Sequence, residues 1–163
     1  MCGIAGIIDL HGRASFDPAL TRAMTARIVH RGPDGDGFFD APGVSLGMRR
    51  LSIIDVAGGD QPIFNEDGSI AIVFNGEIYN YVELHDALTA QGHVFRTRCD
   101  TETLVHLYEQ RGLALFDALR GMYAFALWDG NAGRLILAVA VSYTHLRAHE
   151  TPEQLVCRLL LEK

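Results

Sequence analysis

The sequence lacks an apolar stretch of the ~20 residues that a membrane-spanning helix requires. Its N-terminus has no basic residue ahead of the short apolar run, and Asp9 interrupts that run, so a signal peptide is not indicated. Basic residues are few as well, because 14 Lys and Arg stand against 20 Asp and Glu, a net charge of -6. A nucleic-acid-binding surface would need clustered Lys and Arg. We therefore expect neither a membrane nor a nucleic acid as partner.

Cysteine is scarce, with three residues in the whole chain: Cys2, Cys99 and Cys157. An odd number of cysteines without a secretory signal argues against a disulfide framework, and we expect a cytoplasmic protein. No C-x-x-C pair is present, so a zinc knuckle is not indicated. His145 and His149 are four residues apart and would share a helical face, but no set of ligands completes a site there. We expect no metal site.

The composition is that of a globular protein with one core, since 48% of the 163 residues are apolar and 21% are charged. Hydrophobic patterns and turn signals predict strands at 2–10, 44–48, 70–74, 94–97, 122–129 and 134–138. They predict helices after residue 17, at 80–91 and from 100 or 101 onward, and a loop at 31–43. This order indicates an α+β fold, with helices on mostly antiparallel sheets.

The first helix has the clearest boundaries. Asp17 is a good N-cap, Pro18 suits the first helical position, and Gly32 follows the end. Leu20 and Met24 are four residues apart, so they are expected on one apolar face.

A cysteine at position 2 has a specific chemical consequence. Initiator Met is normally removed before a small residue, which would leave Cys2 with both a thiol and a free α-amine. An α-amine with a pKa of about 7.7–8.0 is partly neutral at pH 7 and can accept the thiol proton. One residue would then supply nucleophile and general base. The simpler alternative is a small apolar cysteine at the start of a buried strand.

Six segments resemble class II glutamine amidotransferases, which are N-terminal-nucleophile hydrolases, and asparagine synthetases in particular. The segments are MCGIAG at 1–6, HRGPD at 30–34, RLSIID at 50–55 with Gln61-Pro62 after it, NGEIYN at 75–80, DTE at 100–102 and GMYAFALWD at 121–129. They occur in the family's order and cover residues 1 to about 138. One departure is Met48, where the synthetases often have His; we expect this side chain to face the core or the wall of the site.

The resemblance implies a four-layer αββα sandwich of antiparallel sheets, incomplete at its C-terminal end. It also implies a domain boundary near residue 138. Residues 139–163 have no counterpart in the family and resemble a spurious ending read through from a sequencing adapter. We expect this tail to lie outside the sheet, as a short helix or a loose segment.

The family's catalytic residues map onto three positions here. The resemblance makes Cys2 the nucleophile and base, and it assigns the side-chain amide of Asn75 and the backbone N–H of Gly76 to the oxyanion of the tetrahedral intermediate. Such donors, aimed at developing charge in a dry site, can each contribute ~3 kcal/mol. On spacing alone, the Asn-Gly pair after an apolar run would instead predict a hairpin turn.

Substrate recognition maps onto five further positions. The resemblance implies that Arg50 binds the α-carboxylate of glutamine, for which a planar bidentate donor is suited. Asp100 would bind the α-ammonium group, although it could also be a plain helix N-cap. Glu77 is expected to hold the substrate or its loop, and backbone groups of Leu51 and Ile53 to line the pocket.

The implied activity is hydrolysis of L-glutamine to L-glutamate and ammonia through a thioester on Cys2, with no cofactor in this domain. In the family, ammonia passes to a synthetase domain that uses ATP and Mg²⁺ to amidate aspartate, and no Gly-rich phosphate-binding segment of that kind occurs in these residues. The expected partners are L-glutamine and that further domain, and a homodimer is an open alternative to a single copy of the chain. The alternatives are a non-catalytic or misfolded fragment of the same fold, or a domain with a different ammonia acceptor.

Overall fold

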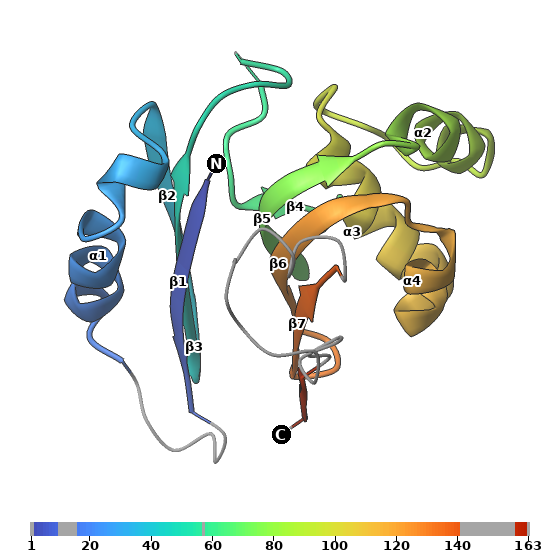
Figure 1. The fold of residues 1–163 in the computed structure, drawn as a ribbon. Coiled ribbons are helices and arrows are strands. Elements are labelled where there is room, and N and C mark those ends of the chain that lie inside the picture. The colour runs from blue at the N-terminus through green and yellow to red at the C-terminus, as the bar shows by residue number, and fades with distance from the viewer. Residues whose placement is uncertain (1, 10–15, 57, 141–158, 163) are drawn as a thin grey trace, which may run out of the picture.

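The computed structural model describes residues 2–9, 16–56, 58–140 and 159–162. Figure 1 shows four layers, with α1 on one side, two stacked sheets in the middle, and α2, α3 and α4 on the other side. The first sheet contains β1 (Gly3–Ile8), β2 (Gly35–Ala41) and β3 (Val44–Arg50). The second contains β4 (Ile63–Phe64), β5 (Ile70–Ile78), β6 (Gly121–Asp129), β7 (Arg134–Val139) and β8 (Leu159–Glu162). The helices are α1 (Pro18–Ala26), α2 (Tyr81–Ala90), α3 (Asp100–Arg111) and α4 (Leu115–Ala118), with 3₁₀ turns at Val29–Arg31 and Gly112–Ala114.

The first sheet is antiparallel, in the order β1-β3-β2. Strand β2 corrects the prediction of a loop at 31–43, because residues 35–41 pair with β3 along their whole length. Their sequence, GDGFFDA, lacks regular apolar alternation, which suits an edge strand whose outer side needs no partner.

The second sheet has the order β4-β5-β6-β7-β8, and each neighbouring pair is antiparallel. Strands β5 and β6 pair over nine residues, with Asn75 opposite Ala124 and Gly76 opposite Tyr123. The Asn-Gly pair is therefore inside a strand, so the alternative of a hairpin turn at this position is wrong.

The end of the chain differs from the prediction for residues 139–163. Val139 is the last residue of β7, and residues 159–162 form β8, which pairs antiparallel with β7. The expectation that the whole tail lies outside the sheet is therefore wrong for these five residues. Pairing satisfies backbone groups that β7 would otherwise expose along an edge. Residues 141–158 and 163, with His145, His149 and Cys157, lie outside the described residues.

Helix α1 begins as predicted, since the Asp17 side chain accepts a hydrogen bond from the backbone N–H of Ala19 at 2.9 Å. Its buried face differs from the expected one. Leu20 and Met24 are 53% and 42% exposed, whereas Thr21 and Thr25 are buried against the sheet. The threonines are small enough for a close approach to β3, and their hydroxyls bond Ser45 and a helix carbonyl, so burial leaves them satisfied.

Two hydrophobic cores hold the layers together. One lies between the sheets and joins Met48 and Leu46 of β3 to Val73 and Trp128 of the second sheet. Met48 is fully buried there, as expected from its position in the sequence. The other core packs the opposite face of the second sheet against the helices, with Leu104 and other α3 residues at its centre.

The strand predicted at residues 94–97 is absent, and the segment is an irregular connection between α2 and α3. Its backbone N–H groups bond carboxylates instead of a neighbouring strand. Those of Arg96 and Thr97 donate to Glu102 at 2.8 and 2.7 Å, and that of Val94 donates to Glu66 at 3.3 Å. Within the part of the chain described here, no helix is both long and apolar enough to cross a membrane.

Candidate active site

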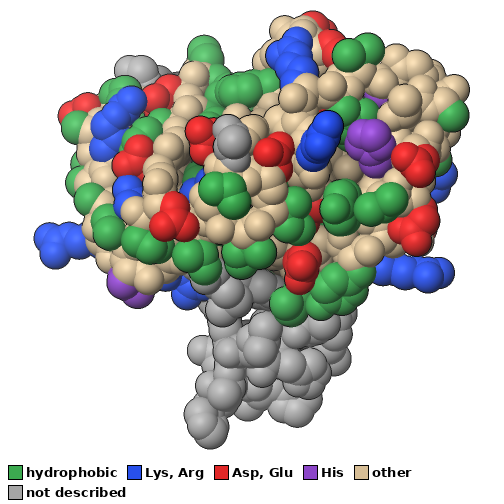
Figure 2. All heavy atoms as spheres, turned by 90° about the horizontal axis from the view of Figure 1, so that it is seen from above, with side chains coloured by type: hydrophobic (Ala, Val, Ile, Leu, Met, Phe, Trp, Pro, Cys, Tyr) green, Lys and Arg blue, Asp and Glu red, His purple; other side chains and the backbone are tan. Residues whose placement is uncertain are grey.

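One cavity of about 160 Å³ opens where β1, β3, β5 and the start of α3 meet. This is the end of the sheets at which β1 begins in Figure 1, and it faces the viewer in Figure 2. Basic side chains on this face are scattered among acidic and apolar ones. All eight residues predicted for the site line the cavity: Cys2, Arg50, Leu51, Ile53, Asn75, Gly76, Glu77 and Asp100.

Cys2 is placed by the pairing of the first sheet. Because β1 runs antiparallel to β3, Leu51 at the end of β3 lies beside Cys2. The backbone N–H of Leu51 donates to Sγ of Cys2 at 3.3 Å, and Sγ lies 3.6 Å from the Leu51 carbonyl oxygen. Arg31 Nε donates to the Cys2 carbonyl oxygen at 3.2 Å. Leu51 thus contacts the sulfur and Arg31 the backbone of Cys2, and together they hold the residue at the cavity wall.

Asn75 and Gly76 lie near the end of β5. Asn75 is 6% exposed, and its neighbour Gly76 has a φ of +154°, a conformation that side chains rarely adopt. A Cβ at Gly76 would overlap the carbonyl oxygen of Met122 on β6. The close pairing of the two strands therefore requires glycine here, which leaves its backbone exposed to the cavity without a side chain in front of it.

Arg50 is 5% exposed and already has four oxygen partners. Its Nη1 donates to the Asp60 carboxylate at 2.8 Å and to the carbonyl of Val56 at 3.3 Å. Its Nη2 donates to the carbonyls of Asp55 at 2.6 Å and Ile54 at 3.2 Å. In this conformation the guanidinium organises the loop that follows β3, a role that the sequence did not predict.

Asp100 is the first residue of α3, and the helix N-cap is Cys99, so the simple N-cap alternative for Asp100 is wrong. Its Oδ2 accepts the backbone N–H of Ile78, at the end of β5, at 3.0 Å. Burial raises the pKa of the Asp100 carboxyl, and the nearby charge of Glu77 acts in the same direction, while the hydrogen bonds from Ile78 and Thr101 oppose it. A raised pKa means that the buried carboxylate is costly to ionise. A cationic group beside Asp100 would favour the ionised form and offset this cost.

Gln61 and Cys99 are among the residues that line the cavity without having been predicted for it. Gln61 accepts the backbone N–H of Phe74 at 2.6 Å and so supports β5 next to Asn75. Cys99 is 4% exposed and packs in the helix-side core as a small apolar side chain. It also faces the cavity, and desolvation raises the pKa of its thiol. Gln61 could have been found, because it belongs to the Gln-Pro pair of the family motif.

The αββα sandwich, with a cysteine just before its first strand, is the N-terminal-nucleophile hydrolase fold that the sequence predicts. The chain superposes on the solved PRPP amidotransferase of Bacillus subtilis with a TM-score of 0.70, which confirms the fold. The match covers 86% of this chain and 37% of that one, at 23% identity.

Residues 1–140 match the model of the glutamine amidotransferase domain, and the chain belongs to that family. It is 46% identical over 133 residues to an asparagine synthetase (glutamine-hydrolysing) of Bacillus subtilis, a match that covers 80% of this chain and 21% of the relative. It is 38% identical over 138 residues to one from Arabidopsis thaliana, covering 85% of this chain and 23% of the relative. The resemblance to asparagine synthetases is thus confirmed, and the chain spans about a fifth of the length of these relatives.

Proposed function

We propose that this domain hydrolyses L-glutamine to L-glutamate and ammonia through a γ-glutamyl thioester on Cys2. The observation that carries the proposal is that Sγ of Cys2 borders the same cavity as Asn75, Gly76 and Asp100. A nucleophile, two oxyanion donors and an ammonium-binding carboxylate therefore border one space, although they come from three separate parts of the chain.

In the proposed reaction, the α-amine of Cys2, free once Met1 is removed, takes the thiol proton, and sulfur attacks the γ-carbonyl carbon. The tetrahedral oxyanion is held by the Asn75 amide and the Gly76 N–H. Collapse of this intermediate breaks the C–N bond, and the amine proton passes to the departing ammonia. Water then attacks the thioester, which releases glutamate and restores the thiol.

Recognition of the amino-acid end of glutamine is assigned to Asp100 and Arg50. The ionised Asp100 carboxylate receives the α-ammonium group. For Arg50 to bind the α-carboxylate, the substrate must replace Asp60 at Nη1, and the 86% exposure of the Asp60 side chain makes that exchange inexpensive. A substrate carboxylate would reproduce the ionic contact that Asp60 now makes.

Three other predicted residues have supporting positions. The Leu51 backbone lies against the Cys2 sulfur, so it would border the reacting carbonyl of the substrate. Ile53 is 73% exposed and lines the cavity, which suits a place at its mouth. Glu77 follows the oxyanion pair on β5 and is partly buried. We assign it to holding the substrate or the loop around it.

We further propose that the ammonia passes to an ATP- and Mg²⁺-dependent synthetase domain and that aspartate is the acceptor there. The proposal also includes a homodimer, a cytoplasmic location and a domain boundary at residue 138. A non-catalytic domain of the same fold is the competing proposal.

The proposal is tested by reacting the chain with a glutamine analogue that has a γ-diazoketone, followed by intact mass and peptide mapping. We expect loss of Met1 and one adduct, on Cys2. Cys99 is the internal control, because it lines the same cavity but desolvation disfavours its thiolate. An adduct on Cys99, or unchanged glutaminase activity in Cys2→Ala, would contradict the mechanism. Retained Met1 together with absent activity would favour the non-catalytic alternative.

A further inference from the structure

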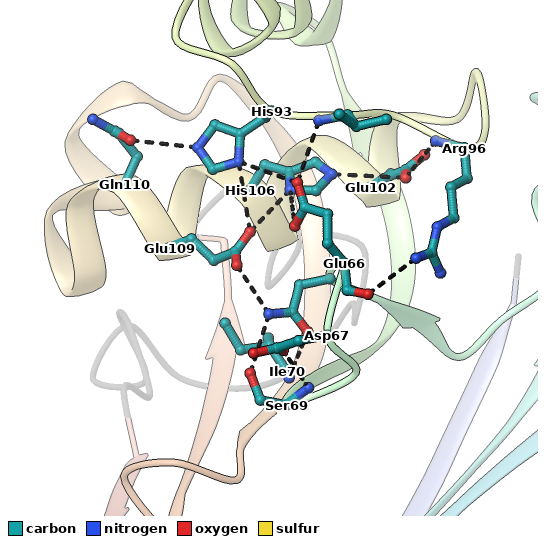
Figure 3. A network of polar contacts seen from close by, with 12 residues as sticks. Glu66, Asp67, Ser69, Ile70, His93, Arg96, Glu102, His106, Glu109 and Gln110 are labelled. Carbon is teal, nitrogen blue, oxygen red and sulfur yellow. Dashed lines mark hydrogen bonds and ion pairs between the residues drawn. The ribbon is translucent and has the colours of Figure 1, made fainter.

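Two histidines and two glutamates gather on the helix side of the second sheet, apart from the residues that line the cavity. We call them the His–Glu cluster: Glu66, His93, His106 and Glu109. Glu66 belongs to the turn between β4 and β5, His93 to the connection between α2 and α3, and the other two to α3. Figure 3 shows the four side chains pointing toward one another from these three segments.

The spacing of the donor atoms suits a metal ion. Nδ1 of His106 lies 2.9 Å from Glu109 Oε2 and 3.5 Å from Glu66 Oε2. Nδ1 of His93 lies 3.7 Å from Glu109 Oε2 and 3.7 Å from Glu66 Oε1. Ligands at ~2.0–2.2 Å from a tetrahedral Zn²⁺ ion are ~3.4 Å from one another. These four separations lie on both sides of that value, and the whole set of donor atoms lies within 4.8 Å of one another. Binding an ion therefore requires the farthest atoms to approach one another by about 1.4 Å.

The atoms of these side chains that face away from the centre of the cluster also lie near polar groups. Both imidazoles turn Nδ1 inward and Nε2 outward, toward an oxygen acceptor. Nε2 of His93 is 3.3 Å from Oε1 of Gln110, within hydrogen-bond distance, whereas Nε2 of His106 is 3.7 Å from Oε1 of Glu102, near this acceptor but beyond hydrogen-bond distance. Oε1 of Glu109 accepts from Nδ2 of Asn65 at 2.9 Å. Metal-bound histidines generally present their second nitrogen to such an acceptor, which fixes the ring and its tautomer.

Burial gives the cluster an enclosed side and an open side. The His106 side chain is 1% exposed and that of His93 is 16% exposed, whereas the Glu66 side chain is 39% exposed. An ion could therefore enter past Glu66 and bind nitrogen ligands that are already held in place. Without an ion, the same groups can form ion pairs with protonated histidines, and this is the alternative that the test must separate.

We propose that the His–Glu cluster binds one divalent transition-metal ion, with Zn²⁺ as the ion it fits best. Two imidazoles and two carboxylates are borderline ligands that suit Zn²⁺, whereas Mg²⁺ and Ca²⁺ prefer oxygen donors alone. A bound ion would link three segments: the connection at 91–99, helix α3 and the turn between β4 and β5. Its role is structural, because four protein ligands close a tetrahedral site and leave no position for substrate.

Two other parts of the chain could bind zinc, so the test removes them first. The background variant has Cys2→Ala, which removes the N-terminal thiol, together with His145→Ala and His149→Ala. This protein is stripped with a chelator and titrated with Zn²⁺ against a chromophoric competitor. We expect one equivalent to bind, and a hundredfold excess over Kd to raise Tm by about 5–10 °C. Mg²⁺ at the same concentration should raise Tm by less than 1 °C, roughly a tenth of the Zn²⁺ effect.

Matched substitutions locate the site. In the background variant, His93→Gln and Glu66→Gln should each weaken Zn²⁺ binding by at least ~10- to 100-fold. Both side chains are partly exposed, so the folded state should survive, and circular dichroism checks this. His85→Gln is the control, because His85 is an exposed histidine of α2 outside the cluster, and it should bind Zn²⁺ like the background. Absence of stoichiometric binding in the background variant, or equal binding by His93→Gln and His85→Gln, would overturn the proposal.

Discussion

The carboxylate of Asp60 lies 2.8 Å from Nη1 of Arg50, at the position where a substrate carboxylate would be expected to bind. Asp60→Asn should therefore lower the KM for glutamine, because a neutral amide competes less well for the guanidinium. An exposed ion pair contributes ~0.2–1 kcal/mol, so the expected decrease is about 1.4- to 5-fold, with kcat unchanged. Steady-state glutaminase kinetics measure both constants.

The matched substitution is Arg50→Lys, which replaces a bidentate donor by a point charge and should raise KM more than it lowers kcat. If Asp60→Asn raised KM instead, Asp60 would be an organiser of the loop and not a competitor of the substrate. An unchanged KM with a collapsed kcat in Arg50→Lys would remove Arg50 from carboxylate binding.

Asn75→Ala should lower kcat by roughly 10²–10³ with a modest change in KM, because the amide is assigned to the oxyanion and not to the ground-state substrate. The side chain is 6% exposed, so a fold check by circular dichroism accompanies the kinetics. A large increase in KM at normal kcat would place Asn75 in substrate binding.

Gly76→Ala should destabilise the fold by about 2–5 kcal/mol, since it combines a strained φ with overlap against β6. Gly68 is the matched control. Its φ is +76°, but a Cβ there would have nothing within 4 Å, so Gly68→Ala should cost only about 1–2 kcal/mol. Urea unfolding of both variants gives the comparison, and equal losses would show that the contact with Met122 is unimportant.

Much of the fold could be predicted because local signals were strong. Asp17 and Pro18 fixed the start of α1, and apolar runs identified β3, β5, β6 and β7. Strand β2 was missed because an edge strand needs no continuous apolar pattern. The strand expected at 94–97 is absent because carboxylates from two other segments satisfy its N–H groups. Side-chain-to-backbone contacts of this kind have no hydrophobic periodicity that would reveal them, and the contact of Val94 with Glu66 joins residues 28 positions apart.

The candidate site likewise has parts that the sequence could predict and parts that it could not. Its eight predicted residues line one cavity because the motifs that contain them lie at the start of β1, the ends of β3 and β5 and the start of α3. The partners of Arg50 could not be predicted, since they are mostly backbone carbonyls of an irregular loop. The His–Glu cluster was also invisible in the sequence. Only His106 and Glu109 have a helical spacing, and the other two members come from separate segments.

Asp100 allows a prediction about pH. Its carboxyl must be ionised to attract the α-ammonium group of glutamine, and burial raises its pKa above the ordinary value of 3.8. As the pH falls, protonation should therefore raise the KM for glutamine at a higher pH than an exposed aspartate would. Asp100→Asn should raise KM by about ten- to a hundredfold at neutral pH, the equivalent of the ~1.5–3 kcal/mol of a charged hydrogen bond. In this variant, KM should also lose the increase at low pH that protonation of Asp100 causes in the parent.

The folding stability of Asp100→Asn distinguishes binding of the α-ammonium group by Asp100 from a purely structural role of this residue. Because the pKa of Asp100 is higher in the folded state than in the unfolded state, its contribution to stability is present at low pH and is lost as the pH rises through the folded-state pKa. An asparagine is neutral at every pH and can still accept the Ile78 N–H through its amide oxygen. Asp100→Asn should thus be at least as stable as the parent at pH 7, while it binds glutamine poorly. Urea unfolding at pH 7, measured beside KM from pH 5 to 8, tests both halves. A variant with a normal KM and reduced stability would show that Asp100 only joins α3 to β5.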